Sequence, residues 1–395
     1  MPLVEKPLAD IVTLSRASAR TVCSAAALLT SLASGAFAIE YNPATGAVRG
    51  MPIEEQRTNL CLWNQQLDNA AWTKSGATVT ANAAVAPTGN TTADSLVEDT
   101  ANTTHSASQN ITTAASTTYA LSCFVEANGR NAYLRFDRTG DSGTNVIGTF
   151  DLTAGTVVSA VAAGSATVSQ SGIEDWGGGL YRCWISGSIG ANTDGRIRIF
   201  TLDGTTVSYL GNGSSGVYPW GVQFEAGSAA SSYMGETTTA AITRLADSLT
   251  IGTLSPWFNA VNGTIYIEYE PSQVGGGVNR YAISINDGTT NNFIGLASND
   301  ATNNAAQRVA VGGTSVVTSA LGAASAAITK AAGSYKVNNF AAAINGGSPV
   351  TDLAGAVPTV DRVFLMGGGG FAMTAGRLRQ VTYYPAIKNT QTLTA

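Results

Sequence analysis

Short runs in which apolar and polar residues alternate dominate the chain. In the run VYPWGVQFE, Tyr218, Trp220, Val222 and Phe224 alternate with small or polar residues. This period of two is typical of a strand with one buried face. Because no segment outside the N-terminus keeps a helical period of apolar residues, the pattern predicts an all-β chain.

The runs fall into two groups separated by turns rich in Gly, Asn, Asp and Ser. The first group comprises Leu60–Trp63, Gly76–Ala84, Ser95–Glu98, His105–Ile111, Thr118–Ala127, Tyr133–Asp137, Gly148–Asp151, Gly155–Val161, Ala166–Gln170, Leu180–Ser188, Arg196–Leu202 and Val217–Glu225. The second comprises Gly263–Tyr269, Arg280–Asn286, Phe293–Ala297, Ala306–Val311, Ser315–Thr318, Asn339–Ile344, Arg362–Met366 and Gly376–Tyr384. Spacing of this kind favours antiparallel sandwiches or jelly rolls.

Breaks between the groups predict the domain organisation. Gly227 and the Ser/Ala run after it end the first group, and a Thr/Ala-rich linker follows. We therefore expect an N-terminal arm (1–57), a jelly roll (58–236), a linker (237–248) and a second sandwich (249–395). The predicted fold is all-β: an N-terminal arm followed by two antiparallel β-sandwich (jelly-roll) domains.

The N-terminal segment contains an apolar stretch, Val22–Ala38, that resembles a secretory signal. Serines and threonines interrupt this stretch, and acidic Glu5 and Asp10 stand in the lead that should be basic. It is also too short and too polar to span a bilayer. We interpret it as part of the arm, without membrane insertion, and expect a short helix over its alanine-rich middle, Ser24–Ala33.

Composition narrows the classes of function. The chain has 395 residues, a net charge of −5, 44 glycines and only 12 % charged residues. So few charges are typical of a rigid β-protein packed into an assembly. Arg196 and Arg198 share one strand face, as residues at i and i+2 do, and are interpreted as a solvated face. No basic stripe carries interleaved aromatics, so nucleic-acid binding is not expected.

The cysteines and the histidine do not form a metal motif. Cys23, Cys61, Cys123 and Cys183 show no CxxC spacing, and His105 is the only histidine. A Cys/His zinc site is therefore not expected, and we predict no metal and no cofactor. Cys123 and Cys183 follow the apolar parity of their strands. The sequence leaves open the cysteine redox state and whether Cys23 or Cys61 crosslinks subunits.

Several motifs resemble proteins of tailed-bacteriophage particles. VYPWGVQFEAG followed by SSY and TRLAD resembles a joint common in virion proteins, and SRASARTV followed by EYNPATGAVRGMPIEEQRTNL resembles the N-terminal arm of fibre-type proteins. TTYALSCFVEA and GLYRCWISGSI resemble strands of a carbohydrate-binding-module-like jelly roll. GTIYIEYEP, NNFAAAINGG and GRLRQVTYYP resemble a concanavalin-like lectin/glucanase sandwich.

The resemblance implies a structural protein of the virion with a fibre, spike or decoration role. Residues 1–57 would contact other virion proteins, the protein would be a homo-oligomer, most simply a trimer, and the sandwiches would bind host-surface polysaccharide. Two alternatives stay open: a purely structural capsid, collar or baseplate component, and a glycan-cleaving spike. The place on the particle, the glycan and the oligomer number are left open.

We predict no enzymatic activity and no catalytic residue. Glu268 and Glu270 share one face of a strand, but the acid set of a concanavalin-like glucanase is incomplete around them. Retaining hydrolysis needs two carboxyl groups about 5 Å apart across a sugar cleft. Asp137, Asp141 and Asn145 are interpreted as an Asx-rich turn, because a calcium site needs more oxygen ligands than they offer.

The candidate glycan-binding residues are Trp184, Arg182, Trp72 and Trp176. Strand parity places Arg182 and Trp184 opposite the apolar side of Leu180–Ser188, so the indole could stack on a sugar ring while the guanidinium donates hydrogen bonds. Trp72 and Trp176 stand at loop positions. The alternative for Trp184 is a subunit interface.

Overall fold

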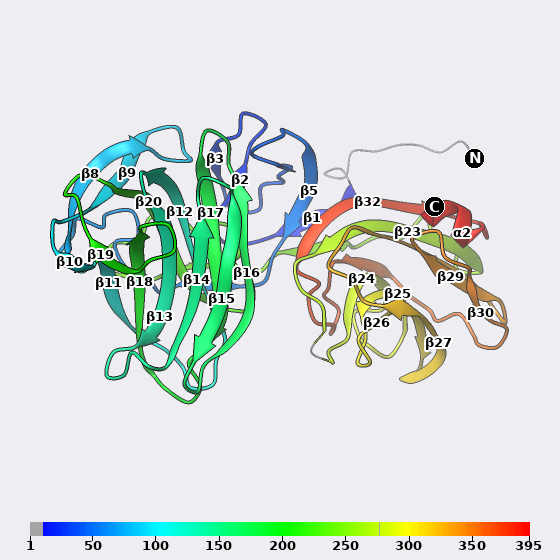
Figure 1. Cartoon of the computed structure of the whole chain (residues 1–395). Helices are drawn as coiled ribbons and strands as arrows, with labels where there is room; N and C mark the ends of the chain where they lie inside the picture. The colour runs from blue at the N-terminus through cyan, green and yellow to red at the C-terminus, as the bar shows by residue number, and fades with distance from the viewer. Residues whose placement is uncertain (1–10, 276) are drawn as a thin grey trace.

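The computed structural model describes residues 11–275 and 277–395, and these form two β-sandwiches that lie side by side (Figure 1). Strands account for nearly all regular structure, and the helix α2 (Thr390–Thr394) lies at the C-terminus. All pairings between the strands of the large sheets are antiparallel. The predicted all-β fold with two antiparallel sandwiches is therefore confirmed.

The first sandwich consists of two six-stranded sheets. One, which we call the joint sheet, has the order β16 (Thr167–Asp175), β17 (Leu180–Ser188), β12 (Tyr119–Asn128), β20 (Gly216–Ala226), β9 (Thr91–Glu98) and β8 (Ala77–Val85). The other, the arginine sheet, has the order β15 (Thr156–Ala163), β14 (Asn145–Asp151), β13 (Asn131–Arg138), β18 (Asp194–Leu202), β11 (Ser106–Thr112) and β7 (Thr73–Ser75). A short pair, β10 (Asn102–Thr104) and β19 (Ser208–Leu210), lies beside them.

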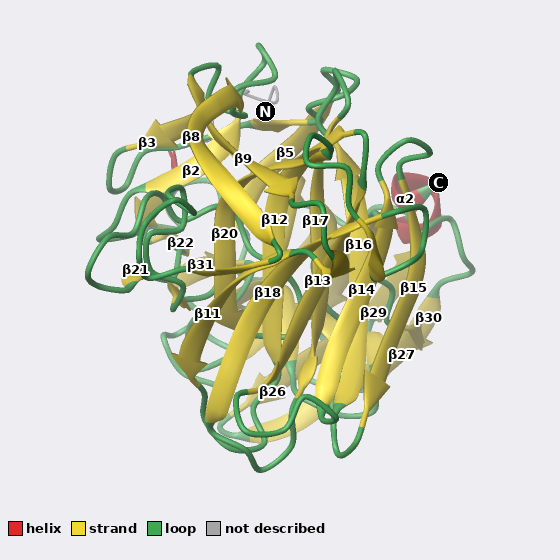
Figure 2. Ribbon diagram, turned by 60° about the vertical axis from the view of Figure 1, so that its left-hand side comes forward, coloured by secondary structure: helices red, strands yellow, loops and turns green. Residues whose placement is uncertain are grey.

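Alternate residues of both sheets fill the core between them. Leu121, Cys123 and Val125 of β12 point inward and pack with Leu134 and Phe136 of β13. The residues between them in sequence therefore point to the outer faces of the sandwich, because side chains alternate along a strand. Figure 2 shows β11, β18, β13, β14 and β15 of the arginine sheet side by side.

The second sandwich consists of two seven-stranded sheets. One has the order β1 (Thr13–Ser15), β22 (Ser248–Ile251), β31 (Arg362–Leu365), β24 (Arg280–Asn286), β25 (Phe293–Asn299), β26 (Asn304–Val311) and β27 (Thr314–Ala323). The other has the order β30 (Val350–Asp352), β29 (Phe340–Ile344), β28 (Thr329–Lys336), β23 (Asn262–Pro271), β32 (Gly376–Tyr384), β5 (Val48–Ile53) and β4 (Glu40–Tyr41). A large apolar core separates the two sheets.

The described part of the N-terminal segment is built into both sandwiches. β1 pairs with β22 and β5 pairs with β32, so each of these two strands is part of one sheet of the second sandwich. The hairpin of β2 (Arg20–Cys23) and β3 (Leu29–Leu32) packs instead on the outer face of the joint sheet. β6 (Arg57–Asn59) pairs with β21 (Ile242–Arg244) of the expected linker. The expected separate arm that ends at residue 57 therefore does not match the strand pairing, and residues 1–10 lie outside the described part.

Two local predictions are wrong. Ser24–Ala33 is not a helix but the turn and second strand of the β2–β3 hairpin, with Ala27 at φ +57°. Leu60–Trp63 is not a strand, because the side chain of Gln109 takes the place of a neighbouring strand: it accepts from the Leu62 N–H at 2.9 Å and donates to the Leu62 carbonyl at 2.8 Å. Strand β28 was not predicted from the sequence. Its residues are mostly small, so its two faces differ little in hydrophobicity.

Candidate functional site

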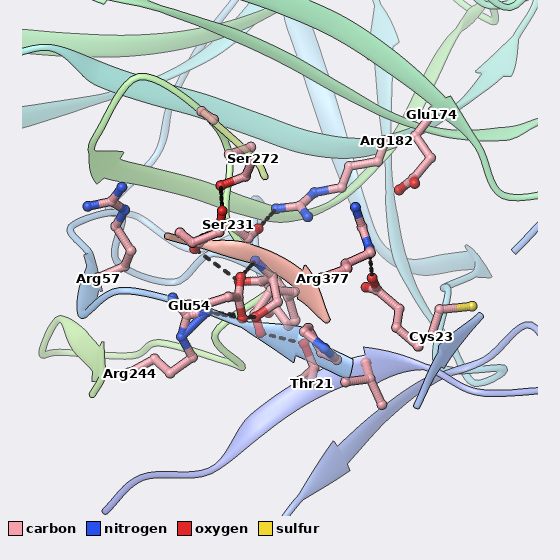
Figure 3. Close-up of a pocket in the computed structure, with 18 of the residues that line it drawn as sticks. Thr21, Cys23, Glu54, Arg57, Glu174, Arg182, Ser231, Arg244, Ser272 and Arg377 are labelled. Carbon is pink, nitrogen blue, oxygen red and sulfur yellow. Dashed lines mark hydrogen bonds and ion pairs between the residues drawn. The ribbon is translucent and has the colours of Figure 1, made fainter. Parts of the chain in front are cut away.

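A cavity of about 140 Å³ lies where the β2–β3 hairpin, the joint sheet and the second sandwich meet (Figure 3). It is lined by residues from all three parts, among them Thr21, Arg182, Ser231 and Arg377. Ligand pockets usually measure about 300–1,000 Å³, and a water in the liquid occupies about 30 Å³. The cavity therefore has room for a few water molecules and not for a saccharide.

Most acidic and basic side chains around this cavity are paired with one another. Glu54 Oε2 lies 2.6 Å from Arg20 Nη2, also contacts Arg244, and accepts from the Ser232 hydroxyl at 2.6 Å. Burial would raise the pKa of Glu54, but Arg244, Arg20 and the Ser232 hydrogen bonds outweigh it and hold that pKa well below its usual value. Arg377 Nε donates to Glu40 at 2.5 Å. This network holds the joint together and leaves no charge around Glu54 or Glu40 free for a ligand.

Arg182 and Trp176 lie at this joint rather than on an open surface. As parity predicted, Arg182 points away from the core, but its Nη2 donates to Ser122 Oγ at 3.1 Å and to the Ser231 carbonyl at 2.7 Å. Trp176 is buried, and its indole N–H donates to Glu174 at 2.9 Å. Trp176 is therefore not an open stacking platform, and Arg182 is not an open donor to a ligand, because the hairpin and the segment around Ser231 cover the outer face of the joint sheet.

The other two predicted tryptophans differ in exposure. Trp72 is only 1 % exposed, packs in the core of the first sandwich and donates to the Trp63 carbonyl at 3.0 Å, so it is not a platform. Trp184 is half-buried and lies between its cross-strand neighbours Ser122 and Gly172. A ligand role for Trp184 stays a prediction.

Three arginines gather on the outer face of the arginine sheet. Arg135, Arg196 and Arg198 occupy paired positions on β13 and β18 and all face the buried carboxylate of Asp137. Arg196 holds Asp137 through two hydrogen bonds of 2.9 and 3.2 Å. We call Arg135, Arg196, Arg198 and Asp137 the arginine row. The shared face of Arg196 and Arg198 follows from their spacing in the sequence, but the strand register that brings Arg135 and Asp137 beside them leaves no local signal.

An open depression of about 450 Å³ lies next to the arginine row, at the edge of the same sheet. The short strand β7 begins at Thr73, the partner of Ser108, so among the described residues no strand continues the ladder beside Gln109–Thr112 on the side opposite β18. The depression is lined by a mixture of apolar and polar side chains: Leu60, Leu62, Ala71, Thr73, Gln109, Asn110, Ile111 and Thr112. This site was not predicted, because an unpaired strand edge leaves no local signal in the sequence.

Neither a catalytic acid pair nor a metal centre emerges from the geometry. Glu268 Oε1 forms an ion pair with Arg379 at 2.8 Å, and Glu270 lies 3.9 Å from Arg377, so both carboxylates face cations. Within residues 11–275 and 277–395, no group of three or more His, Cys, Asp or Glu side chains is placed to hold a metal ion. His105 is buried and contacts two backbone carbonyls.

All four cysteines are buried free thiols. Burial raises the pKa of Cys23 to about 11 and that of Cys123 to about 12. Cys23 and Cys61 are therefore not surface thiols poised to crosslink subunits.

Among the described residues, no helix is long and apolar enough to cross a membrane.

Comparisons with known proteins find distant structural likeness only. No family model and no curated protein sequence matches. The carbohydrate-binding module CBM40 of the Ruminococcus gnavus IT-sialidase, bound to α2,3-sialyllactose, is 18 % identical, with a TM-score of 0.29 over 34 % of this chain and 82 % of that one. Domains LG4-5 of the mouse laminin α1 chain are 10 % identical, with a TM-score of 0.25 over 68 % and 82 %. A Trypanosoma rangeli sialidase is 10 % identical, with a TM-score of 0.26 over 81 % and 60 %. Likeness at this level carries no information on ligand or reaction.

Proposed function

We propose that this chain is a non-enzymatic structural protein of a bacteriophage particle that binds host-surface glycans through its first sandwich. The virion role rests on the fibre-type and joint motifs of the sequence. The glycan role rests on one observation, the open depression beside β11 with the arginine row next to it. Its size is that of a small-molecule site, and its lining combines apolar surface with a few polar groups, as such sites do.

The depression offers groups that suit a sugar. Leu60 and Leu62 supply apolar surface for the carbon-bound face of a pyranose ring. Asn110 is exposed and lines the depression. Its amide NH2 can donate hydrogen bonds to sugar hydroxyl groups, and its amide oxygen can accept hydrogen bonds from them. Binding at one such site is expected to be weak, around 1 mM or about −4 kcal/mol. Several copies on one particle would raise the effective strength by avidity.

Attachment to other virion proteins is proposed through the surface of the N-terminal segment. Leu28, Ile39 and Val48 of this segment are large apolar side chains that stay exposed. The protein is proposed to be a homotrimer, since appendages gain avidity from closed rotational symmetry. Native mass spectrometry of the purified protein and peptide analysis of purified particles test these proposals. A monomer in solution, or absence from the particle, would contradict them.

The glycan site is tested with a pair of matched variants. Asn110→Ala removes an exposed amide in the depression, and Asn102→Ala removes an exposed amide elsewhere on the same sandwich. We expect Asn110→Ala to weaken binding of the protein to host envelope polysaccharide several-fold and Asn102→Ala to leave it unchanged. Equal binding by the wild type and both variants would contradict the proposed site. Trp184→Ala is measured as a third variant, because Trp184 is half-buried and is the alternative candidate for the glycan-binding residue.

A further inference from the structure

The arginine row carries more positive charge than its carboxylate can neutralise. Arg196 occupies both oxygens of Asp137, Arg135 Nε lies 2.8 Å from Oδ2, and Arg198 Nη2 lies 3.3 Å from the same oxygen. One carboxylate therefore faces three guanidinium groups. Arg138, the next arginine along β13, is paired separately with Asp194 at 3.0 Å.

Arg198 forms fewer hydrogen bonds than Arg135 and Arg196 do. Among the described residues its guanidinium makes no hydrogen bond, and its buried Nε has no partner. Its side chain is 19 % exposed, so the guanidinium can be reached from solvent. Asn145, the cross-strand partner of Asp137, is buried and has an Oδ1 that also lacks a partner. Surplus positive charge therefore lies beside a guanidinium that has an unpaired donor, and either a solvent water or an anionic ligand group completes that donor.

The row and the depression are joined by the strand register. Asn110, which lines the depression, is the partner of Arg196 across the β11–β18 pairing. Ser108 is the partner of Arg198 in the same ladder and of Thr73 on its other side. Directly opposed residues lie about 4.5–5.5 Å apart. A sugar that contacts Asn110 in the depression would therefore lie one strand away from Arg196 of the arginine row.

We infer that the depression and the arginine row together select a saccharide that carries an anionic group, with Arg198 and Arg196 receiving that group. This inference rests on the proposed function and names its ligand class. A guanidinium donates two parallel hydrogen bonds to a carboxylate or a phosphate, and such charge-assisted bonds are roughly twice as strong as neutral ones. Both anions suit the row, and the experiment separates them.

Three methyl glycosides that differ only in the substituent on ring carbon C5 test the inference: methyl glucoside, the methyl glycoside of glucuronic acid with its carboxylate free, and methyl glucoside 6-phosphate. Their dissociation constants for the wild-type chain and for each variant are measured by ligand-observed NMR at fixed ionic strength. The wild type is expected to bind at least one anionic probe about tenfold more tightly than methyl glucoside. A tenfold difference in dissociation constant corresponds to about 1.4 kcal/mol of binding free energy. Preference for the glucuronide or for the phosphate identifies the anion.

Variants connect the preference to the row. Arg198→Gln is expected to remove the tenfold preference, Arg198→Lys to keep part of it, and the control Arg138→Gln to leave it intact. Thermal unfolding of each variant checks that the sandwich still folds. Equal affinity of the wild type for all three probes, or a preference that survives Arg198→Gln, overturns the inference and leaves the proposed glycan role standing. Failure of all three probes to bind contradicts both.

Discussion

Arg16 Nη1 lies 2.9 Å from Asp247 Oδ1, with both side chains fully buried and a separation of 231 positions along the chain. Arg20 contacts the other oxygen of Asp247 at 3.2 Å. The N-terminal segment is thereby tied to the linker between the sandwiches. Because a buried charge without its partner is strongly unfavourable, these ion pairs make the segment part of the folded body.

Replacing Asp247 is expected to destabilise the protein strongly. Asp247→Asn leaves the buried guanidinium of Arg16 without its anion and that of Arg20 with Glu54 alone, and breaking a buried pair typically costs about 3–5 kcal/mol. Asp361→Asn is the matched control, because Asp361 pairs with Arg362 at the surface, where pairs contribute about 0–1 kcal/mol. Chemical denaturation measures both free energies of unfolding, and equal values for the two variants would contradict the assigned role of Asp247.

Deletion of residues 1–38 gives a second test of the same point. It removes β1 from its sheet, both arginines from Asp247 and the hairpin from the joint sheet. The truncated chain is expected to be less stable and to expose apolar surface to a fluorescent dye. A truncated chain as stable as the full one would show that the segment is a separate arm after all.

The joint is expected to weaken in acid. The pKa of Glu54 is held below its usual 4.5 in the folded protein, so the unfolded chain binds the proton more readily. The resulting stabilisation is present above about pH 4.5 and is lost progressively as the pH falls below that value. Glu54→Gln should be less stable at neutral pH and should lose less stability between pH 6 and about pH 3. Parallel pH profiles for the wild type and this variant would contradict the role of Glu54.

Gly172 is expected to be required for the position of Trp184. A Cβ atom on Gly172 would lie 2.0 Å from Cζ2 of the indole. Gly172→Ala should therefore destabilise the first sandwich by about 1–3 kcal/mol, the usual cost of overpacking. Gly252→Ala is the control, since a Cβ there meets nothing within 4 Å. If the indole causes the clash, the double variant with Trp184→Ala will be less than additive in thermal unfolding.

Glycan cleavage is not expected. Glu268 and Glu270 both face arginines, so no free acid pair is available on β23. Incubation of the protein with host polysaccharide should release no new reducing ends. Release that disappears in Glu268→Gln would show that the protein is a glycan-cleaving spike instead.

The fold could be predicted from the sequence further than the site could. The bounds of strands such as β17 and β24 match the runs predicted from the sequence, because apolar residues at alternate positions of each pack in a core. Parity also oriented Arg182 correctly, but nothing local to β17 shows that the β2–β3 hairpin covers that face. The arginine row depends on which strands pair and in what register, and the depression depends on where β7 begins. Both are long-range properties that a periodic pattern does not contain.

The most direct test of the central claim is an experimental structure of the protein with a bound saccharide from the host envelope. We predict saccharide density in the depression beside β11, in contact with Asn110 and with its anionic group at Arg198. Saccharide bound at Trp184, on the second sandwich or elsewhere, with the depression empty at saturating ligand, would contradict the claim.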